Sequence, residues 1–169
     1  RELPGSVIIP ALEGSRCLLV EAQALVAPSS FSTSTRKSTG LDPNRLSLLL
    51  AVLEKKMDYR LYNCDIFVCI AGGLKIFEPA IDLGVIMAIA SSFCNRCIDS
   101  SIAVIGEVGL GGEVRAVSRI ENRIREVIHM GFEKCVIPKR NVKGLPPDLS
   151  NKIQLIQVEV VEEAIHELM

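Results

Sequence analysis

Two short patterns in the sequence have the composition of binding sites, but each lacks the residues that would complete one. The run Gly109–Gly112 (GLGG) is as rich in glycine as a phosphate-binding loop. Such a loop also needs a following helix with a Gly-Lys-Ser/Thr triplet, which the sequence lacks. Cys94 and Cys97 have the spacing of half a zinc site, without a second Cys-x-x-Cys pair. We therefore expect neither site, and Cys94 and Cys97 have no assigned role.

The side chains able to transfer protons are few and scattered along the chain. Asp82 and Glu121 each lie at the start of a predicted helix, and two carboxyl groups held close together can share a proton. Helix N-termini also stabilise carboxylates that have no catalytic duty. His129 and His166 lie on predicted helices without a Cys or Ser partner nearby, which favours surface or half-buried positions. Spacing alone identifies no catalytic residue.

Positive charge is concentrated in two stretches, although the formal net charge is only -1. Residues 36–60 contain six Lys or Arg against three Asp or Glu, and residues 115–147 contain eight against three. Such segregation is typical of a solvated face and also of a surface that binds phosphates. With 4% aromatic residues and no Trp, base stacking is disfavoured, so a nucleic-acid contact would use Arg and Lys on phosphates.

The composition is that of one folded domain over residues 1–169. Hydrophobic residues make up 49% of the chain and charged residues 23%, which excludes a disordered protein. The longest apolar stretch, 81–93, contains Asp82 and is too short for the ~20 residues of a membrane span, so we expect no membrane partner. Six cysteines among apolar neighbours indicate reduced, mostly buried thiols in an intracellular protein. The start at Arg1 without Met indicates a piece of a longer protein.

Strands and helices mix without strict alternation, which favours an α+β fold. The first half is predicted to contain paired strands at 6–10 and 16–27, a mobile Ser/Thr-rich loop at 29–39, a helix at 43–56 capped by Asp42, a strand at 65–71 buried on both faces, and a buried central helix at 79–92. The second half is predicted to contain two strands within 102–117 joined by a two-residue turn at Gly111 and Gly112, a helix with a capping box at Ser118 and Glu121 that ends at Gly131, strands at 135–138 and 153–158, and a helix at 160–169.

Four motifs in this order resemble one family: Pro10–Arg16 (PALEGSR), Leu19–Val26 (LVEAQALV), Thr39–Leu46 (TGLDPNRL) and Gly106–Arg115 (GEVGLGGEVR). Ala71–Leu74 (AGGL) and Val136–Pro138 (VIP) add to the likeness. The set is similar to the C-terminal domain of bacterial-type RadA (Sms) DNA repair proteins, which is itself similar to the proteolytic domain of Lon proteases. The resemblance covers nearly the whole chain. It implies a Lon-like fold of mixed sheets packed with helices.

Lon-type peptidases use a Ser-Lys dyad, in which a buried neutral lysine takes the proton of the attacking serine hydroxyl. By the resemblance, the serine position falls on Asp82 and the lysine position on Glu121. Neither side chain can replace its counterpart. The resemblance therefore implies a domain without peptidase activity, as in RadA, whose Lon-like domain lacks the dyad as well.

The family resemblance implies a role in homologous recombination and DNA repair. Its members are hexameric ATP-driven DNA helicases that promote branch migration, and a zinc finger and a RecA-like ATPase precede the Lon-like domain. ATP, Mg and Zn are therefore expected only in those parts of the parent, and no cofactor here. The expected partners are DNA and further copies of the chain in a homo-hexamer. Localisation is expected in the bacterial cytoplasm, or in a plant mitochondrion or plastid, which the cysteines and Ser-rich loop suggest.

The charge distribution and the resemblance together select the candidate DNA contacts: Arg36, Lys37, Arg45, Arg115, Arg119, Arg123, Lys139 and Arg140. Two alternatives stay open at this point. One is a Lon-type peptidase that uses residues not identified here, and the other is an oligomerisation module that does not contact DNA.

Overall fold

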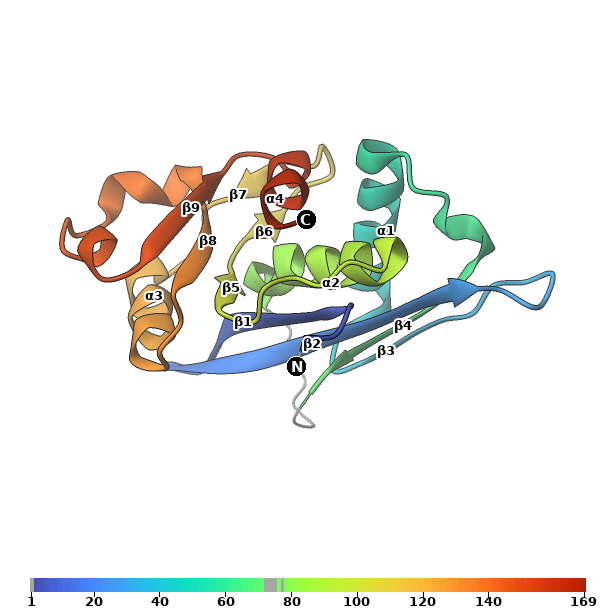
Figure 1. The fold of residues 1–169 in the computed structure, drawn as a ribbon, viewed down its shortest axis with the longest axis horizontal. Helices are drawn as coiled ribbons and strands as arrows, with labels where there is room; N and C mark the ends of the chain where they lie inside the picture. Colours follow the sequence, from blue (N-terminus) through green and yellow to red (C-terminus); the bar gives the residue numbers. More distant parts are fainter. Residues whose placement is uncertain (1, 72–75, 77) are drawn as a thin grey trace.

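A seven-stranded mixed sheet forms the centre of the computed structural model, which describes residues 2–71, 76 and 78–169 (Figure 1). The strands β4, β2 and β1 are antiparallel neighbours, β3 is parallel to β4, and β5, β8 and β9 run parallel to β1. Their order across the sheet is β3 (Arg36–Thr39), β4 (Cys64–Ile70), β2 (Arg16–Pro28), β1 (Ser6–Glu13), β5 (Ile102–Val104), β8 (Lys134–Pro138) and β9 (Gln154–Val158). A two-stranded sheet of β6 (Glu107–Val108) and β7 (Val114–Arg115) lies beside it. The predicted α+β class and single domain are confirmed.

The helices divide between the two faces of the large sheet. α1 (Pro43–Met57), α2 (Asp82–Cys94) and α4 (Val161–Leu168) pack together on one face, whereas α3 (Ile120–His129) packs against β1 and β2 on the other (Figure 1). None of the helices in the described part of the chain is long and apolar enough to cross a membrane.

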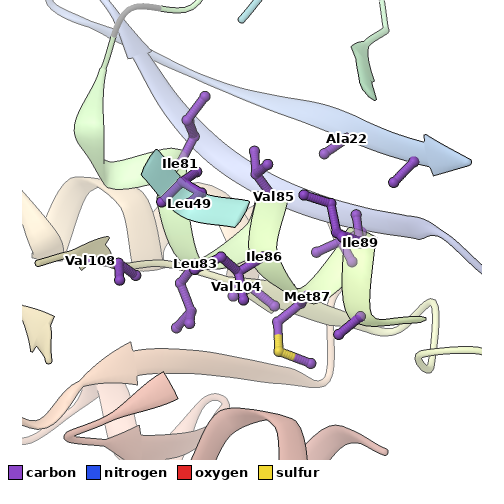
Figure 2. Packing of buried hydrophobic residues seen from close by; sticks show 14 of the residues in the cluster. Ala22, Leu49, Ile81, Leu83, Val85, Ile86, Met87, Ile89, Val104 and Val108 are labelled. Carbon is purple, nitrogen blue, oxygen red and sulfur yellow. The ribbon is translucent and has the colours of Figure 1, made fainter. Parts of the chain in front are cut away.

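The central helix is as buried as its sequence predicts. Every residue from Asp82 to Ser91 is buried, because the sheet covers one side of α2 and helices α1 and α4 cover the other. Val85 points toward the strand that carries Ala22, whereas Leu83 and Met87 point away from it (Figure 2). A helix that is apolar around almost its whole circumference has no polar face that must contact water, so it is stable in this central, buried position.

Two predictions for the β3–β4 region are wrong. Arg36–Thr39, predicted as part of a loop, form β3 because they pair in parallel with β4, a long-range contact that a polar composition does not reveal. β4 was predicted to be buried on both faces, but its side chains alternate and Phe67 is 38% exposed. On this face of the sheet α3 lies against β1 and β2, and no helix in the described part of the chain lies over β4 and β3 (Figure 1). Gly72 and Gly73 of the AGGL motif, which follow the predicted strand, lie outside the described residues.

A predicted hairpin turn and a predicted helix cap also differ from the structure. Residues 102–117 contain β5, β6 and β7 rather than two strands, and the turn between β6 and β7 is the five-residue loop 109–113. The capping box at Ser118 is absent, because Arg119 adopts the left-handed conformation (φ +53°) and the helix begins at Ile120. The Ser118 carbonyl accepts a hydrogen bond from the Arg123 side chain instead. Gly131 follows the end of α3 with φ +86°, as predicted.

Gly84 allows α2 to approach the sheet closely. An added Cβ would overlap Cγ1 and Cδ1 of Ile9, which is fully buried on β1. We therefore expect Gly84→Ala to lower the free energy of unfolding by about 1–3 kcal/mol in urea denaturation, as overpacking of a tight core does. Adding Ile9→Val should recover part of the loss. Gly144→Ala is the control, because open space surrounds that glycine, and an equal loss there would contradict the overlap as the cause.

Candidate functional site

Asp82, the residue at the expected nucleophile position, begins the buried helix α2 and has no exposed surface. Its carboxylate accepts three hydrogen bonds. Two come from the Arg45 guanidinium, one of them from Nε at 2.9 Å, and the third comes from the backbone N–H of Val108 at 3.0 Å. Arg45 lies in the first turn of α1, whose start is fixed by Pro43 and by Asp42, which accepts a hydrogen bond from the Asn44 amide. Three segments distant in sequence therefore meet at one carboxylate.

Burial and pairing act in opposite directions on Asp82. Burial raises the pKa of its carboxyl group, whereas the hydrogen bonds from Arg45 and Val108 lower it. The hydrogen bond to Asp82 raises the pKa of Arg45, so the guanidinium stays charged. An ion pair with both carboxylate oxygens engaged is a structural arrangement, and neither partner is a hydroxyl or thiol nucleophile.

Glu121, the residue at the expected lysine position, has different surroundings. It lies in the first turn of α3, is half exposed, and forms an ion pair with Arg125 at 2.8 Å. Asp82 bonds only to Arg45 and Val108 among the described contacts. Because the two carboxylates have separate partners, the structure gives no support to a shared proton between them.

Arg123, predicted as a DNA contact, is fully buried and is no longer a candidate. Its guanidinium pairs with the Glu78 carboxylate and donates to the carbonyls of Ser118 at 2.8 Å and Pro10 at 3.4 Å. Glu78 also accepts from the Leu12 amide at 2.7 Å, so the pair ties α3 to β1. Sequence reasoning missed both partners. The available signal was that Arg123 lies three residues after Ile120, on the apolar face of the helix.

The remaining basic candidates form two groups. Arg36 and Lys37 lie on β3, the strand at one edge of the large sheet. Arg115, Arg119, Lys139 and Arg140 lie near β7 and β8, toward the other edge. The side chain of Asn141 joins the two segments of this second group, because it accepts from the Val117 amide at 2.9 Å and donates to the Val117 carbonyl at 3.1 Å. We call the second group the basic cluster. Arg45, paired with Asp82, belongs to neither.

Carboxylates neutralise half of the basic cluster. Arg115 pairs with Glu113 at 2.9 Å and Lys139 with Glu159 at 3.3 Å. Arg119 and Arg140 are exposed, and within residues 2–71, 76 and 78–169 neither has a carboxylate partner within 4.0 Å. The net positive charge of the cluster therefore belongs to these two side chains.

The cysteines are free, and two of the six, Cys64 and Cys135, are buried, so the prediction of mostly buried thiols holds only in part. Burial raises the pKa of Cys17 to about 11, which keeps that thiol protonated. Cys94 lies 3.3 Å from the hydroxyl of Tyr59, and Cys97 is exposed. Among the described residues, no three His, Cys, Asp or Glu side chains are placed to hold a metal ion.

The Asp82–Arg45 pair predicts an asymmetric response to mutation. Arg45→Met leaves a buried carboxylate without its cation, and we expect the free energy of unfolding to fall by about 3 kcal/mol in urea denaturation. Adding Asp82→Asn removes the stranded charge and should recover most of that loss. The control is Arg125→Met, which breaks exposed pairs with Glu121 and Asp148 and should cost less than about 1 kcal/mol. If Arg45→Met and Arg125→Met lowered the free energy of unfolding equally, the buried pair would contribute no more to stability than an exposed one.

Comparison with known proteins gives one consistent result. The family model of the Lon protease (S16) C-terminal proteolytic domain matches residues 52–169. The chain is 51% identical over 164 residues to the DNA repair protein RadA of Chlamydia muridarum, which covers 97% of this chain and 36% of that protein. It is 47% identical over 161 residues to RadA of Bacillus subtilis, covering 95% of this chain and 35% of that protein.

The chain thus spans just over a third of the length of the curated relatives it matches. The match to the RadA proteins extends over nearly the whole chain, and the family model covers everything from the middle of α1 to the C-terminal residue. The chain therefore belongs to the family of Lon protease C-terminal proteolytic domains, as a Lon-like domain of the RadA type.

Proposed function

We propose that this chain is a non-proteolytic Lon-like domain of a DNA repair protein, and that it holds a hexameric ring together and contacts DNA. The observation that carries the non-proteolytic part of the proposal is the buried ion pair of Asp82 with Arg45, because the resemblance places the serine of a Lon peptidase on Asp82. The relatives are named DNA repair proteins, which supports the biological context. We propose that the parent protein is a helicase for branch migration in recombination. ATP, Mg and Zn would then bind to parts of the parent outside this chain.

The chemistry of the two dyad positions argues against a peptidase. A Ser-Lys dyad needs a hydroxyl nucleophile and a lysine kept neutral by burial. Asp82 provides neither a hydroxyl nor a free carboxylate, and Glu121 is half exposed and paired with Arg125. These two positions cannot generate an activated nucleophile.

The corresponding expectation is that the chain leaves an unfolded protein intact. Incubation with casein and analysis by gel and mass spectrometry should give no fragments above those of a buffer control, because no side chain at the dyad positions can attack a peptide bond. Fragments that disappear when one residue of the chain is replaced would instead support the peptidase alternative.

The basic cluster is the best-supported DNA contact. Arg119 and Arg140 are exposed, lie on segments that Asn141 holds together, and lack neutralising carboxylates among the described residues. Exposed guanidinium groups bind phosphate oxygens strongly and without sequence preference. Arg36 and Lys37 form a second, separate candidate on β3, so the two groups can be tested independently.

DNA binding should depend on salt and on the basic cluster. Each phosphate contact contributes a slope of about one in the plot of log affinity against log salt. We therefore expect Arg119→Ala with Arg140→Ala to weaken DNA binding at low salt and to reduce this slope by about two, measured by fluorescence anisotropy. Arg16→Ala with Arg60→Ala removes the same charge from other exposed positions and is the matched control.

The same assay separates the remaining alternatives. Arg36→Ala with Lys37→Ala reports on the second group. An absence of DNA binding by the assembled protein at low salt, or an affinity that salt does not change, would contradict the DNA contact. The oligomerisation module without DNA contact would then be the correct description.

A further inference from the structure

Leu25 of β2 and Phe67 of β4 form an apolar surface that is exposed in the described part of the chain. Leu25 is 58% exposed and Phe67 is 38% exposed, although each lies directly opposite the other on neighbouring strands. Lys37 lies opposite Phe67 on the third strand. Together with Gln23, Ala24, Thr39, Val68 and Cys69 these residues line a depression of about 370 Å³, which we call the hollow. Large apolar side chains exposed side by side on a sheet indicate an interaction surface.

The chemistry of the hollow favours a protein partner. Lys37 is the only charged residue among the described residues that line it, and the large side chains of Leu25 and Phe67 are apolar. A nucleic-acid surface needs several positive charges, whereas the core of a protein interface is apolar and poor in charge. The occupant should therefore be an apolar side chain of a protein with a carboxylate near it.

The chain itself presents such a side chain. Leu110 is 75% exposed at the tip of the 109–113 loop. Its neighbours Gly109 and Gly111 have no side chains, and an added Cβ at Gly109 would overlap the Glu113 carboxylate. The loop therefore presents one leucine between glycines, with Glu113 and Glu107 close by and Arg115 bound to both.

Hydrogen bonds hold this loop in a fixed shape. The Gly109 amide donates to the Glu113 carbonyl at 3.0 Å and the Gly112 amide to the Gly109 carbonyl at 2.9 Å. The Glu113 carboxylate accepts from the Gly111 amide at 3.0 Å, and the Val161 amide donates to the Gly112 carbonyl, which anchors the loop to the start of α4. A leucine on a preorganised loop loses little conformational entropy when it binds.

The hollow and the loop lie on opposite sides of the molecule. The loop between β6 and β7 is on the side of the helices α1, α2 and α4 (Figure 1). Leu25 and Phe67 are exposed and alternate with buried residues along β2 and β4, which places the hollow on the opposite face of the sheet. Leu110 therefore cannot enter the hollow of its own chain. Two different patches that complement each other form a head-to-tail contact, which closes into a ring when the rotation between copies allows it.

We propose that Leu110 of one copy of this chain binds in the hollow of the next copy, against Leu25 and Phe67. The carboxylates of Glu107 and Glu113 beside the loop then lie on the same side of the contact as Lys37 of the neighbour. This inference rests on the proposed role as a ring scaffold and names the surfaces that build the ring.

The native Cys69 in the hollow allows a direct test by crosslinking. In a chain with Cys94→Ser and Cys97→Ser, Leu110→Cys should crosslink to Cys69 of the next copy when a short bismaleimide is added, giving a ladder of bands up to six copies on a denaturing gel. Met130→Cys, another exposed apolar position at the end of α3, is the matched control and should give no ladder.

A mixing experiment shows whether the contact is head-to-tail. Chains with Leu110→Cys and Cys69→Ser, mixed with chains that keep Leu110 and Cys69, should give dimers only, because each chain then carries one of the two thiols. Chains with Leu110→Cys and Cys69→Ser alone should give no crosslink. Dimers in that sample would mean that two loops meet each other, and would overturn the proposal.

The mass in solution separates this inference from the scaffold proposal. Light scattering of the unaltered chain is expected to give the mass of six copies, and Leu110→Ser should weaken the contact between copies roughly tenfold to a hundredfold, the effect of losing one buried leucine. An assembled chain without the crosslink from position 110 to Cys69, or unaffected by Leu110→Ser, overturns this inference alone. A monomeric chain overturns both proposals.

Discussion

A carboxylate without exposed surface, at the start of a helix that is buried from Asp82 to Ser91, is the constraint around which this domain is arranged. Asp82 cannot be stable there as an isolated charge, so a cation must be delivered to it from another part of the chain. Arg45 supplies it from the first turn of α1, and the Val108 amide supplies the third hydrogen bond. The positions of α1, α2 and β6 are thereby linked.

A second buried ion pair does the same on the opposite face of the sheet. Arg123 of α3 pairs with Glu78, four residues before Asp82, and Glu78 also binds the backbone of β1. The segment that leads into α2 is therefore tied to both faces of the sheet within five residues. The start of α2 is therefore held by two ion pairs, one on each face of the sheet.

The basic cluster and the hollow occupy different parts of the surface. Arg119 and Arg140, exposed and without carboxylate partners in the described chain, lie near β7 and β8, whereas the described lining of the hollow on β2, β4 and β3 contains one charged residue, Lys37. The basic cluster and the hollow are thus separate, whereas Lys37 of the second basic group lines the hollow itself. The near-neutral net charge conceals this distribution, because it sums basic and acidic stretches of the sequence.

Local signals in the sequence were sufficient for much of the fold. The hairpin of β1 and β2, the Asp42 cap of α1, the buried α2 and the glycine after α3 depend on neighbouring residues, and the quoted motifs were enough to recognise the family. The pairing of β3 with β4, the left-handed Arg119, the burial of Arg123 and the separation of Asp82 from Glu121 were decided only by the tertiary structure. The physical reason is that each depends on a partner far along the chain. A strand needs its neighbour, and a buried charge needs the counter-charge that only folding brings to it.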